Sequence, residues 1–141
     1  MHGNLLLAGD IGGTKTHLAL YDADAVGTPL VREARFDSQA AASLEQLAAT
    51  FLAGERVTAA AFGIAGPVVD NEVRTTNLPW HVLPAQLADV LGTRDIGLLN
   101  DLEATALGAL HLPADRLLTL QAGVHVLSEE ILLNVPVECA Q

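Results

Sequence analysis

The segment Gly9-Asp10-Ile11-Gly12-Gly13-Thr14-Lys15-Thr16 places turn-forming residues between two apolar runs near the amino terminus. The run 5–8 before it is wholly apolar, and the run 17–21 after it alternates with period two. Apolar residues on both sides of turn formers are typical of two strands joined by a tight turn. We therefore predict a strand–turn–strand unit, in which the paired glycines take positive φ and let the backbone approach a ligand closely.

The chemistry of this turn suits a phosphate. Successive N–H groups in a glycine-rich turn form a concavity that attracts anions, and Thr14 and Lys15 add a hydroxyl and a positive charge. Asp10 stands at the mouth of the turn, where a carboxylate is able to hold a phosphate-bound Mg²⁺ through water. The alternative is a glycine-rich hairpin turn that binds nothing, and a motif this short does not separate the two interpretations.

Two better-known nucleotide loops do not match this segment. A Walker loop has the form Gly-x4-Gly-Lys-Ser/Thr and leads into a helix, but Thr14 stands where the second glycine belongs and the alternating exit segment predicts a strand. The dinucleotide fingerprint Gly-x-Gly-x-x-Gly is absent from the chain.

Composition narrows the class of protein. The chain has 141 residues, 50% of them hydrophobic, which is enough for one domain with a core. Its formal net charge of −10 argues against nucleic acid and anionic membranes as partners. The single cysteine, Cys139, provides neither a disulfide framework nor a cysteine zinc site within this chain. No signal-peptide pattern is visible, and the longest apolar run, 59–69, is too short to span a bilayer, so we expect a cytoplasmic protein.

Periodicity predicts the remaining elements. After the hairpin we expect a strand at 30–36, a helix at 43–52 with a Ser43/Gln46 capping box and Gly54 beyond its end, and a buried strand at 58–64. Next come a helix from Pro84 to 91 that ends at Gly92, a strand at 96–99, a helix at 102–110 with Asp101 as its N-cap, and a strand at 117–121. The order β-β-β-α-β-α-β-α-β indicates an α/β fold, a mixed sheet with flanking helices.

Polar residues follow several of these strands. They are Asp10, the turn Gly66-Pro67, Asn77 and the pair Asn100-Asp101. Since ligands of open α/β sheets gather at the carboxyl ends of strands, we expect these groups to converge on one edge. Asp101 is either a helix N-cap or a general base that deprotonates a hydroxyl attacking a phosphoryl group. Asn100 is either a turn residue or a hydrogen-bond partner of a substrate hydroxyl. Trp80 either packs in the core or stacks on a sugar ring, and Lys15 is either a solvated lysine or part of the loop.

Four blocks of the chain together resemble the bacterial glucokinases. The blocks are residues 9–16, Gly63-Ile64-Ala65-Gly66-Pro67-Val68, Thr76-Asn77-Leu78-Pro79-Trp80 and Asn100-Asp101-Leu102-Glu103-Ala104, and the resemblance covers residues 4–123. This family belongs to the actin/hexokinase ATPase superfamily, so the resemblance implies a ribonuclease-H-like core in one domain of a two-domain sugar kinase. The related repressor-ORF-kinase (ROK) sugar kinases share the Asp-Gly-Gly-Thr and Asn-Asp elements, whereas Leu78-Pro79-Trp80 and residues 102–105 favour the glucokinase branch.

The resemblance also implies a reaction. ATP, with Mg²⁺, would phosphorylate the 6-hydroxyl of glucose, the first step of glycolysis. Asn100 and Asp101 would contact glucose, with Asp101 as the catalytic base and with Asn77 and Gly66 on the substrate side. The nucleotide phosphates would be bound by Gly9, Asp10, Ile11, Gly12, Gly13, Thr14 and Lys15, and Mg²⁺ by Asp10 through water.

The carboxyl-terminal part departs from the family. Residues 1–123 resemble a small amino-terminal domain, and the tail 124–141 does not resemble the family. The second phosphate loop, the adenosine-binding segment and the Glu/His block of the glucose site are expected later in the family than this chain extends. We therefore expect a truncated half without turnover, which exposes apolar surface and self-associates as a homo-oligomer. The alternatives are a non-catalytic sugar- or phosphate-binding remnant and a purely structural domain.

Overall fold

The computed structural model describes residues 3–116, so the strand predicted at 117–121 lies outside the described residues. The strands of the main sheet are β1 (Leu5–Ile11), β2 (Lys15–Asp22), β3 (Leu30–Asp37), β4 (Ala59–Ile64) and β8 (Ile96–Asn100). Three short strands form a second sheet: β5 (Val68–Val69), β6 (Glu72–Arg74) and β7 (His81–Val82). The helices are α1 (Leu44–Leu52), α2 (Pro84–Leu91) and α3 (Asp101–Ala109), with short 3₁₀ turns at Ser38–Ala40 and Ala114–Arg116.

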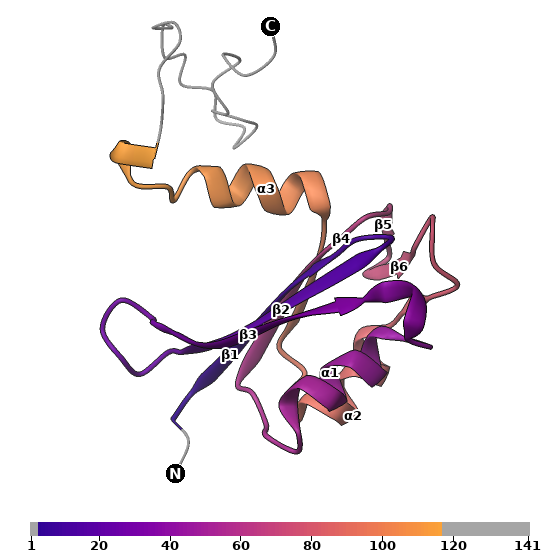
Figure 1. The fold of residues 1–141 in the computed structure, drawn as a ribbon, viewed down its shortest axis with the longest axis horizontal. Coiled ribbons are helices and arrows are strands. Elements are labelled where there is room, and N and C mark those ends of the chain that lie inside the picture. Colours follow the sequence, from indigo (N-terminus) through magenta and orange to yellow (C-terminus); the bar gives the residue numbers. More distant parts are fainter. Residues whose placement is uncertain (1–2, 117–141) are drawn as a thin grey trace, which may run out of the picture.

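The five-stranded sheet has the order β3-β2-β1-β4-β8. Figure 1 shows this sheet with α1 and α2 packed on one side of it. Strands β1, β2 and β3 pair antiparallel, whereas β4 pairs parallel with β1 and β8 pairs parallel with β4. The predicted antiparallel meander followed by alternating helices and strands is therefore confirmed, and the protein has a mixed α/β fold. The parallel register matches Ile11 with Ile64 and Ile64 with Asn100, so three strands end at one edge of the sheet.

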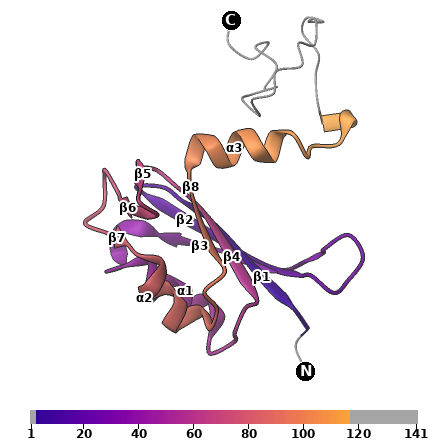
Figure 2. The same cartoon turned by 180° about the vertical axis from the view of Figure 1, so that it is seen from behind.

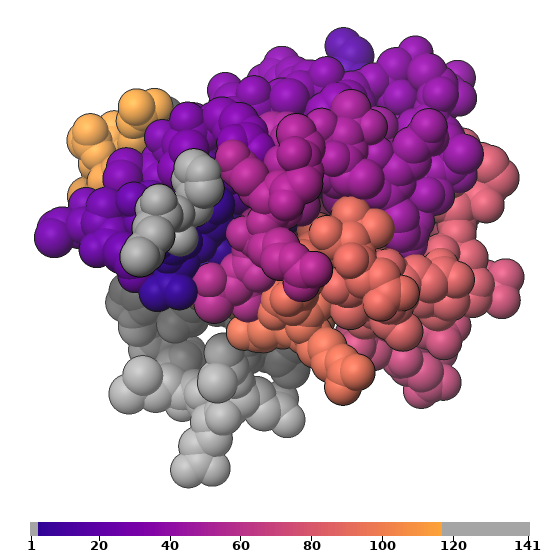
Figure 3. Space-filling model, turned by 90° about the horizontal axis from the view of Figure 1, so that it is seen from below, coloured from indigo at the N-terminus to yellow at the C-terminus, as the bar shows by residue number. Residues whose placement is uncertain are grey.

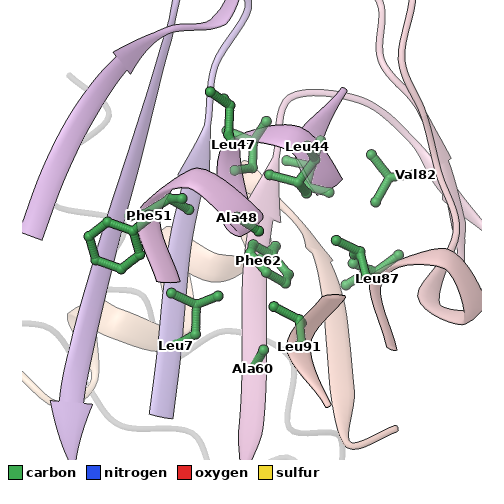
Figure 4. Packing of buried hydrophobic residues seen from close by; sticks show 14 of the residues in the cluster. Leu7, Leu44, Leu47, Ala48, Phe51, Ala60, Phe62, Val82, Leu87 and Leu91 are labelled. Carbon is green, nitrogen blue, oxygen red and sulfur yellow. The ribbon is translucent and has the colours of Figure 1, made fainter. Parts of the chain in front are cut away.

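Helices α1 and α2 cover one face of this sheet, and the core lies beneath them. Alternate strand residues, such as Leu7 in β1 and Phe62 in β4, face the apolar stripe of α1 (Figure 4). Leu87 and Leu91 of α2 are fully buried in the same cluster. The segments of α1 and α2 adjoin on the lower side of the molecule (Figure 3). Burial of such side chains is worth roughly 1.5–3 kcal/mol each, which makes this layer the main source of stability.

The predicted capping of α1 is confirmed, with one shift of position at its start. Ser43 Oγ accepts a hydrogen bond from the Gln46 N–H at 3.3 Å, as a capping box requires. Gln46 Oε1, however, accepts from the N–H of Ala42 at 2.8 Å, one residue before the cap. At the other end the helix stops at Leu52, as predicted, and both Ala53 and Gly54 beyond it have positive φ, 51° and 93°.

The second sheet is a feature that the predicted element order lacks. Residues 68–77 show no clear periodicity, yet β5 and β6 form a hairpin there. Its turn is Asp70-Asn71, with φ of 52° and 59°, and positive φ at both central residues is characteristic of a type I′ turn. The pair Asp70-Asn71, two residues that tolerate positive φ, was the available signal. Strands of two or three residues are too short for periodicity to indicate them.

The start of α3 corrects the predicted cap. The N-cap is Asn100, whose Oδ1 accepts a hydrogen bond from the Leu102 N–H at 3.0 Å, and Asp101 is the first helical residue. The helix begins at the end of β8 and extends away from the sheet, with no buried residue along its length (Figure 2). Leu102 is 76% exposed. Within residues 3–116, none of the helices combines the length and the apolar character needed to cross a bilayer.

We predict that Arg32 stabilises the contact between β3 and α1. Its guanidinium donates to the Phe51 carbonyl at 3.0 Å, lies 5.0 Å from the Phe51 ring centroid and forms an ion pair with Glu55 at 2.9 Å. Arg32→Met keeps the apolar stem but loses these contacts, so the free energy of unfolding should fall by about 1–2 kcal/mol. Urea unfolding measures the change. Arg35→Met, on the opposite face of β3, is the control and should stay within about 0.5 kcal/mol of the unmodified chain.

Candidate functional site

The turn between β1 and β2 comprises Gly12, Gly13 and Thr14, as the predicted strand–turn–strand unit requires. The expected positive φ is wrong, because neither glycine lies in the left-handed region. The glycines serve close approach instead. A Cβ on Gly13 would lie 2.8 Å from Asn77 Cβ, and a Cβ on Gly12 would lie 3.0 Å from the Lys15 carbonyl oxygen.

The turn leaves two backbone donors without a partner, while two of its carbonyls are bonded. The Gly12 carbonyl accepts from Ser38 Oγ at 2.9 Å, and the Thr14 carbonyl accepts from the Ser38 N–H at 3.0 Å. The N–H groups of Gly13 and Thr14, by contrast, donate to no acceptor within residues 3–116. Two adjacent free N–H groups in a turn form the type of nest that binds anions. Beside them lies an open hollow of about 330 Å³ lined by Thr14, Lys15, Asp37 and Gln39.

The loop before β7 carries Asn77 to this turn. Thr75 Oγ1 donates to the carbonyls of Leu78 and Trp80, at 2.8 and 3.2 Å, which closes the loop on itself. Asn77 then lies against Gly13, with its Nδ2 3.3 Å from the position of a Gly13 Cβ. The third sequence block therefore meets the first. The predicted contact between them depends on tertiary structure, because 64 positions separate the two residues.

The Gly66 turn and Asn100 also come together. Asn100 Nδ2 donates to the Gly66 carbonyl at 2.9 Å, while Oδ1 of the same side chain caps α3. Gly66 itself is close-packed, since a Cβ there would lie 3.0 Å from the Arg74 carbonyl oxygen. Asn100 thus ties the end of β4 to the start of α3. One Nδ2 hydrogen and one Oδ1 lone pair remain for a ligand.

Two carboxylates flank Gly63 on the face of the sheet that α1 and α2 leave uncovered. Asp10 is the register partner of Gly63 on the neighbouring strand. Register partners on adjacent strands point to the same face and lie ≈ 4.7–4.9 Å apart. A Cβ on Gly63 would lie 2.9 Å from Ala104 Cβ and 3.9 Å from Asp101 Cα, so α3 starts directly over this position. Asp101 and Asp10 therefore lie at the same edge of the sheet, as expected from the sequence, and on the same face, which the sequence did not predict.

Other candidate residues have structural surroundings. Trp80 is buried, and its Nε1 donates to the Ala41 carbonyl at 3.2 Å, which supports packing rather than sugar stacking. His17 pairs with Glu33 and His81 with Glu72 at the surface. Lys15 is exposed at the rim of the hollow.

The residues present fit a metal ion only in a limited way. Within the described residues, no group of three or more His, Cys, Asp or Glu side chains is arranged to hold a metal. Asp10 is exposed, and its carboxylate has no hydrogen-bond partner among residues 3–116, so it is available to a ligand. Mg²⁺ commonly binds through one or two carboxylates together with substrate phosphates and water. The site fits that mode and does not fit a metal centre made of protein ligands alone.

A nest of N–H groups and a carboxylate at the same sheet edge form the type of arrangement that phosphoryl-transfer proteins use. The family model for glucokinase matches residues 7–136 of this chain. The chain therefore belongs to the glucokinase family. The predicted domain boundary at 123/124 stays a prediction.

Curated relatives agree with this assignment. A glucokinase of Synechocystis sp. is 40% identical over 129 residues, which cover 82% of this chain and 36% of the relative. A glucokinase of Nostoc sp. is 40% identical over 126 residues, which cover 86% of this chain and 37% of the relative. The chain thus spans little more than a third of the length of these relatives.

Solved structures share the fold. A glucokinase from an Antarctic psychrotroph has a TM-score of 0.72 and 26% identity, covering 86% of this chain and 39% of the other. A Balamuthia mandrillaris glucokinase, solved in complex with glucose, has a TM-score of 0.59 and 24% identity, covering 75% of this chain and 32% of the other. A ROK hexokinase from Thermus thermophilus has a TM-score of 0.57 and 24% identity, covering 77% and 38%. The last two likenesses show the fold alone.

We predict that Gly13 is required because Asn77 occupies the space a side chain would need. Gly13→Ala should destabilise the chain by about 1–3 kcal/mol, since the new Cβ overpacks against Asn77. In an Asn77→Gly background the same substitution should cost much less, because the opposing Cβ is gone. Urea unfolding of the four proteins in this double-mutant cycle measures the coupling. Equal costs in both backgrounds would show that the contact does not constrain the loop.

Proposed function

We propose that this chain provides the phosphate loop and the catalytic base of an ATP-dependent glucokinase. The observation that carries the proposal is the meeting of the free N–H groups of Gly13 and Thr14 with Asp101 at one sheet edge. Membership of the glucokinase family supports glucose and ATP as the substrates.

Phosphate binding is assigned to the loop from Gly9 to Lys15. The Gly13 and Thr14 N–H groups donate to phosphate oxygens, and Lys15 supplies positive charge at the rim. Asn77, held against Gly13, lies between the loop and the sugar side, where its amide can contact either substrate. Asp10 would hold Mg²⁺ through water, and the ion would supply positive charge that offsets the charge of the phosphates.

Catalysis is assigned to Asp101. Its carboxylate accepts the proton of the sugar 6-hydroxyl as that oxygen bonds to the terminal phosphorus of ATP. The bond from that phosphorus to the bridging oxygen breaks, and ADP leaves. Asn100 and Gly66 hold the start of α3 against the end of β4, which fixes where this carboxylate stands. Asn100 also orients the sugar through its remaining hydrogen-bonding capacity.

We further propose that the sheet order β3-β2-β1-β4-β8 is the ribonuclease-H-like core of a two-domain sugar kinase. In such kinases a second domain completes the cleft and excludes water. The 141-residue chain alone should therefore bind phosphate but show negligible turnover. Cytoplasmic location and self-association stay predictions. The exposed leucines of α3 and the segment after it, Leu102, Leu107, Leu110 and Leu112, are a surface for such association.

Asp101→Asn tests the catalytic assignment. An amide cannot accept the proton, so kcat should fall at least about a hundredfold in a version of the protein that has the full length of its relatives. The substitution leaves the Asn100 cap intact, so thermal stability should change little. Glu103→Gln, two residues further along α3 and exposed, is the matched control and should retain kcat. A coupled glucose-phosphorylation assay measures both, and full activity in Asp101→Asn would refute the assignment.

Asp10→Asn tests the metal assignment on the 141-residue chain. Calorimetric titration with inorganic tripolyphosphate should show tighter binding when Mg²⁺ is added to the unmodified chain. In Asp10→Asn most of this magnesium dependence should disappear, because the neutral amide does not attract the water shell of the ion as strongly. Asp89→Asn, exposed on α2, is the charge-matched control. Equal magnesium dependence in all three proteins would remove Asp10 from the metal site.

A further inference from the structure

Ser38 lies at the centre of the hydrogen bonds that shape the loop. It is fully buried, as is Thr16, with 0% exposure for each. Its N–H donates to the Thr14 carbonyl and its Oγ donates to the Gly12 carbonyl. Since a carbonyl only accepts, the Ser38 hydroxyl hydrogen is committed to Gly12, and Thr16 Oγ1 must be the donor in the 2.9 Å contact between the two hydroxyls.

Because the peptide unit is planar, a bond that fixes a carbonyl also fixes the direction of the next residue's N–H. The carbonyl of one residue and the N–H of the next belong to one planar trans unit and point in opposite directions. When Ser38 Oγ holds the Gly12 carbonyl, the Gly13 N–H is therefore directed away from Ser38. In the same way, the Ser38 N–H holds the Thr14 carbonyl and so directs the Lys15 N–H away from Ser38.

The position of Ser38 is itself fixed from several sides. It follows β3, whose last residue, Asp37, pairs with Lys15 across the sheet and accepts from the Gln39 N–H at 2.9 Å. Three residues later the Ala41 carbonyl receives the Trp80 indole N–H. The segment 38–41 thus contacts both the loop and the segment that carries Asn77.

We propose that Ser38 is a positioning residue for phosphate binding, which orients the Gly13 N–H toward the anion. This inference rests on the proposed function of the loop. Ser38 does not itself touch the phosphate, because its hydroxyl is buried and already bonded to Gly12 and Thr16. Without the hydroxyl the Gly12 peptide loses the bond that fixes its plane, and the free donor is no longer held in one direction.

The test compares Ser38→Ala with Ser38→Thr in the 141-residue chain. With magnesium tripolyphosphate as the probe, Ser38→Ala should weaken binding about tenfold, the effect of about one buried hydrogen bond. Ser38→Thr keeps the hydroxyl and should recover most of the affinity. Thr93→Val removes a hydroxyl that bonds the Thr58 carbonyl, far from the loop, and should leave affinity unchanged. Unchanged affinity in Ser38→Ala would overturn the proposal.

Two further measurements keep the inference separate from folding and from the proposed function. Thr16→Val removes the donor to Ser38 Oγ and should weaken tripolyphosphate binding, though less than Ser38→Ala does. This variant provides the test if Ser38→Ala does not fold. If the unmodified chain fails to bind tripolyphosphate, the proposed function is wrong. The Gly13 amide then decides the role of Ser38: its NMR chemical shift should move in Ser38→Ala and stay in Thr93→Val, and no movement overturns the positioning role.

Discussion

The parallel pairing of β1, β4 and β8 is the constraint on which the rest of the site depends. Its register matches Ile11 with Ile64 and Ile64 with Asn100, so the three strands end together. Each chain segment that leaves this edge carries one candidate group: the glycine loop after β1, the Gly66 turn after β4 and Asp101 after β8. A shift of one residue in this register would move Asp10 to the face covered by α1 and α2, because successive strand residues point to opposite faces.

Small residues make the assembly of these segments possible. Gly63 leaves room for α3 to begin over β4, and Gly13 leaves room for Asn77. Gly9, on the face covered by α1 and α2, leaves room for Phe62, because a Cβ there would lie 2.5 Å from Phe62 Cδ1. A glycine in a strand is usually destabilising, so its presence here marks a close approach of other atoms. The proposed site therefore depends on glycines that leave room for neighbouring segments as well as on its polar groups.

Much of the fold was predictable because its elements are long and periodic. The hairpin around residues 9–16, the amphipathic helix after Ser43 and the apolar strand ending at Ile64 all have the expected places. The hairpin of β5 and β6 was missed because strands of two or three residues carry no periodicity. The cap of α3 was assigned one residue late because Asn100 and Asp101 are both good capping residues, and both side chains accept from the Leu102 N–H. Only the extended backbone of Asn100, with ψ 148°, identifies it as the cap.

The sequence by itself determined which residues could carry the chemistry: a glycine-rich turn, carboxylates and amides at strand ends, and the four blocks that indicate the family. Tertiary structure alone decided how these residues are used. Gly12 and Gly13 are needed for close approach rather than positive φ, Trp80 packs in the core, and Ser38, unremarked in the sequence, holds the loop. The physical reason is that a motif records local backbone preference. The bonds and contacts that orient a donor come from residues distant in the chain, and no local pattern contains them.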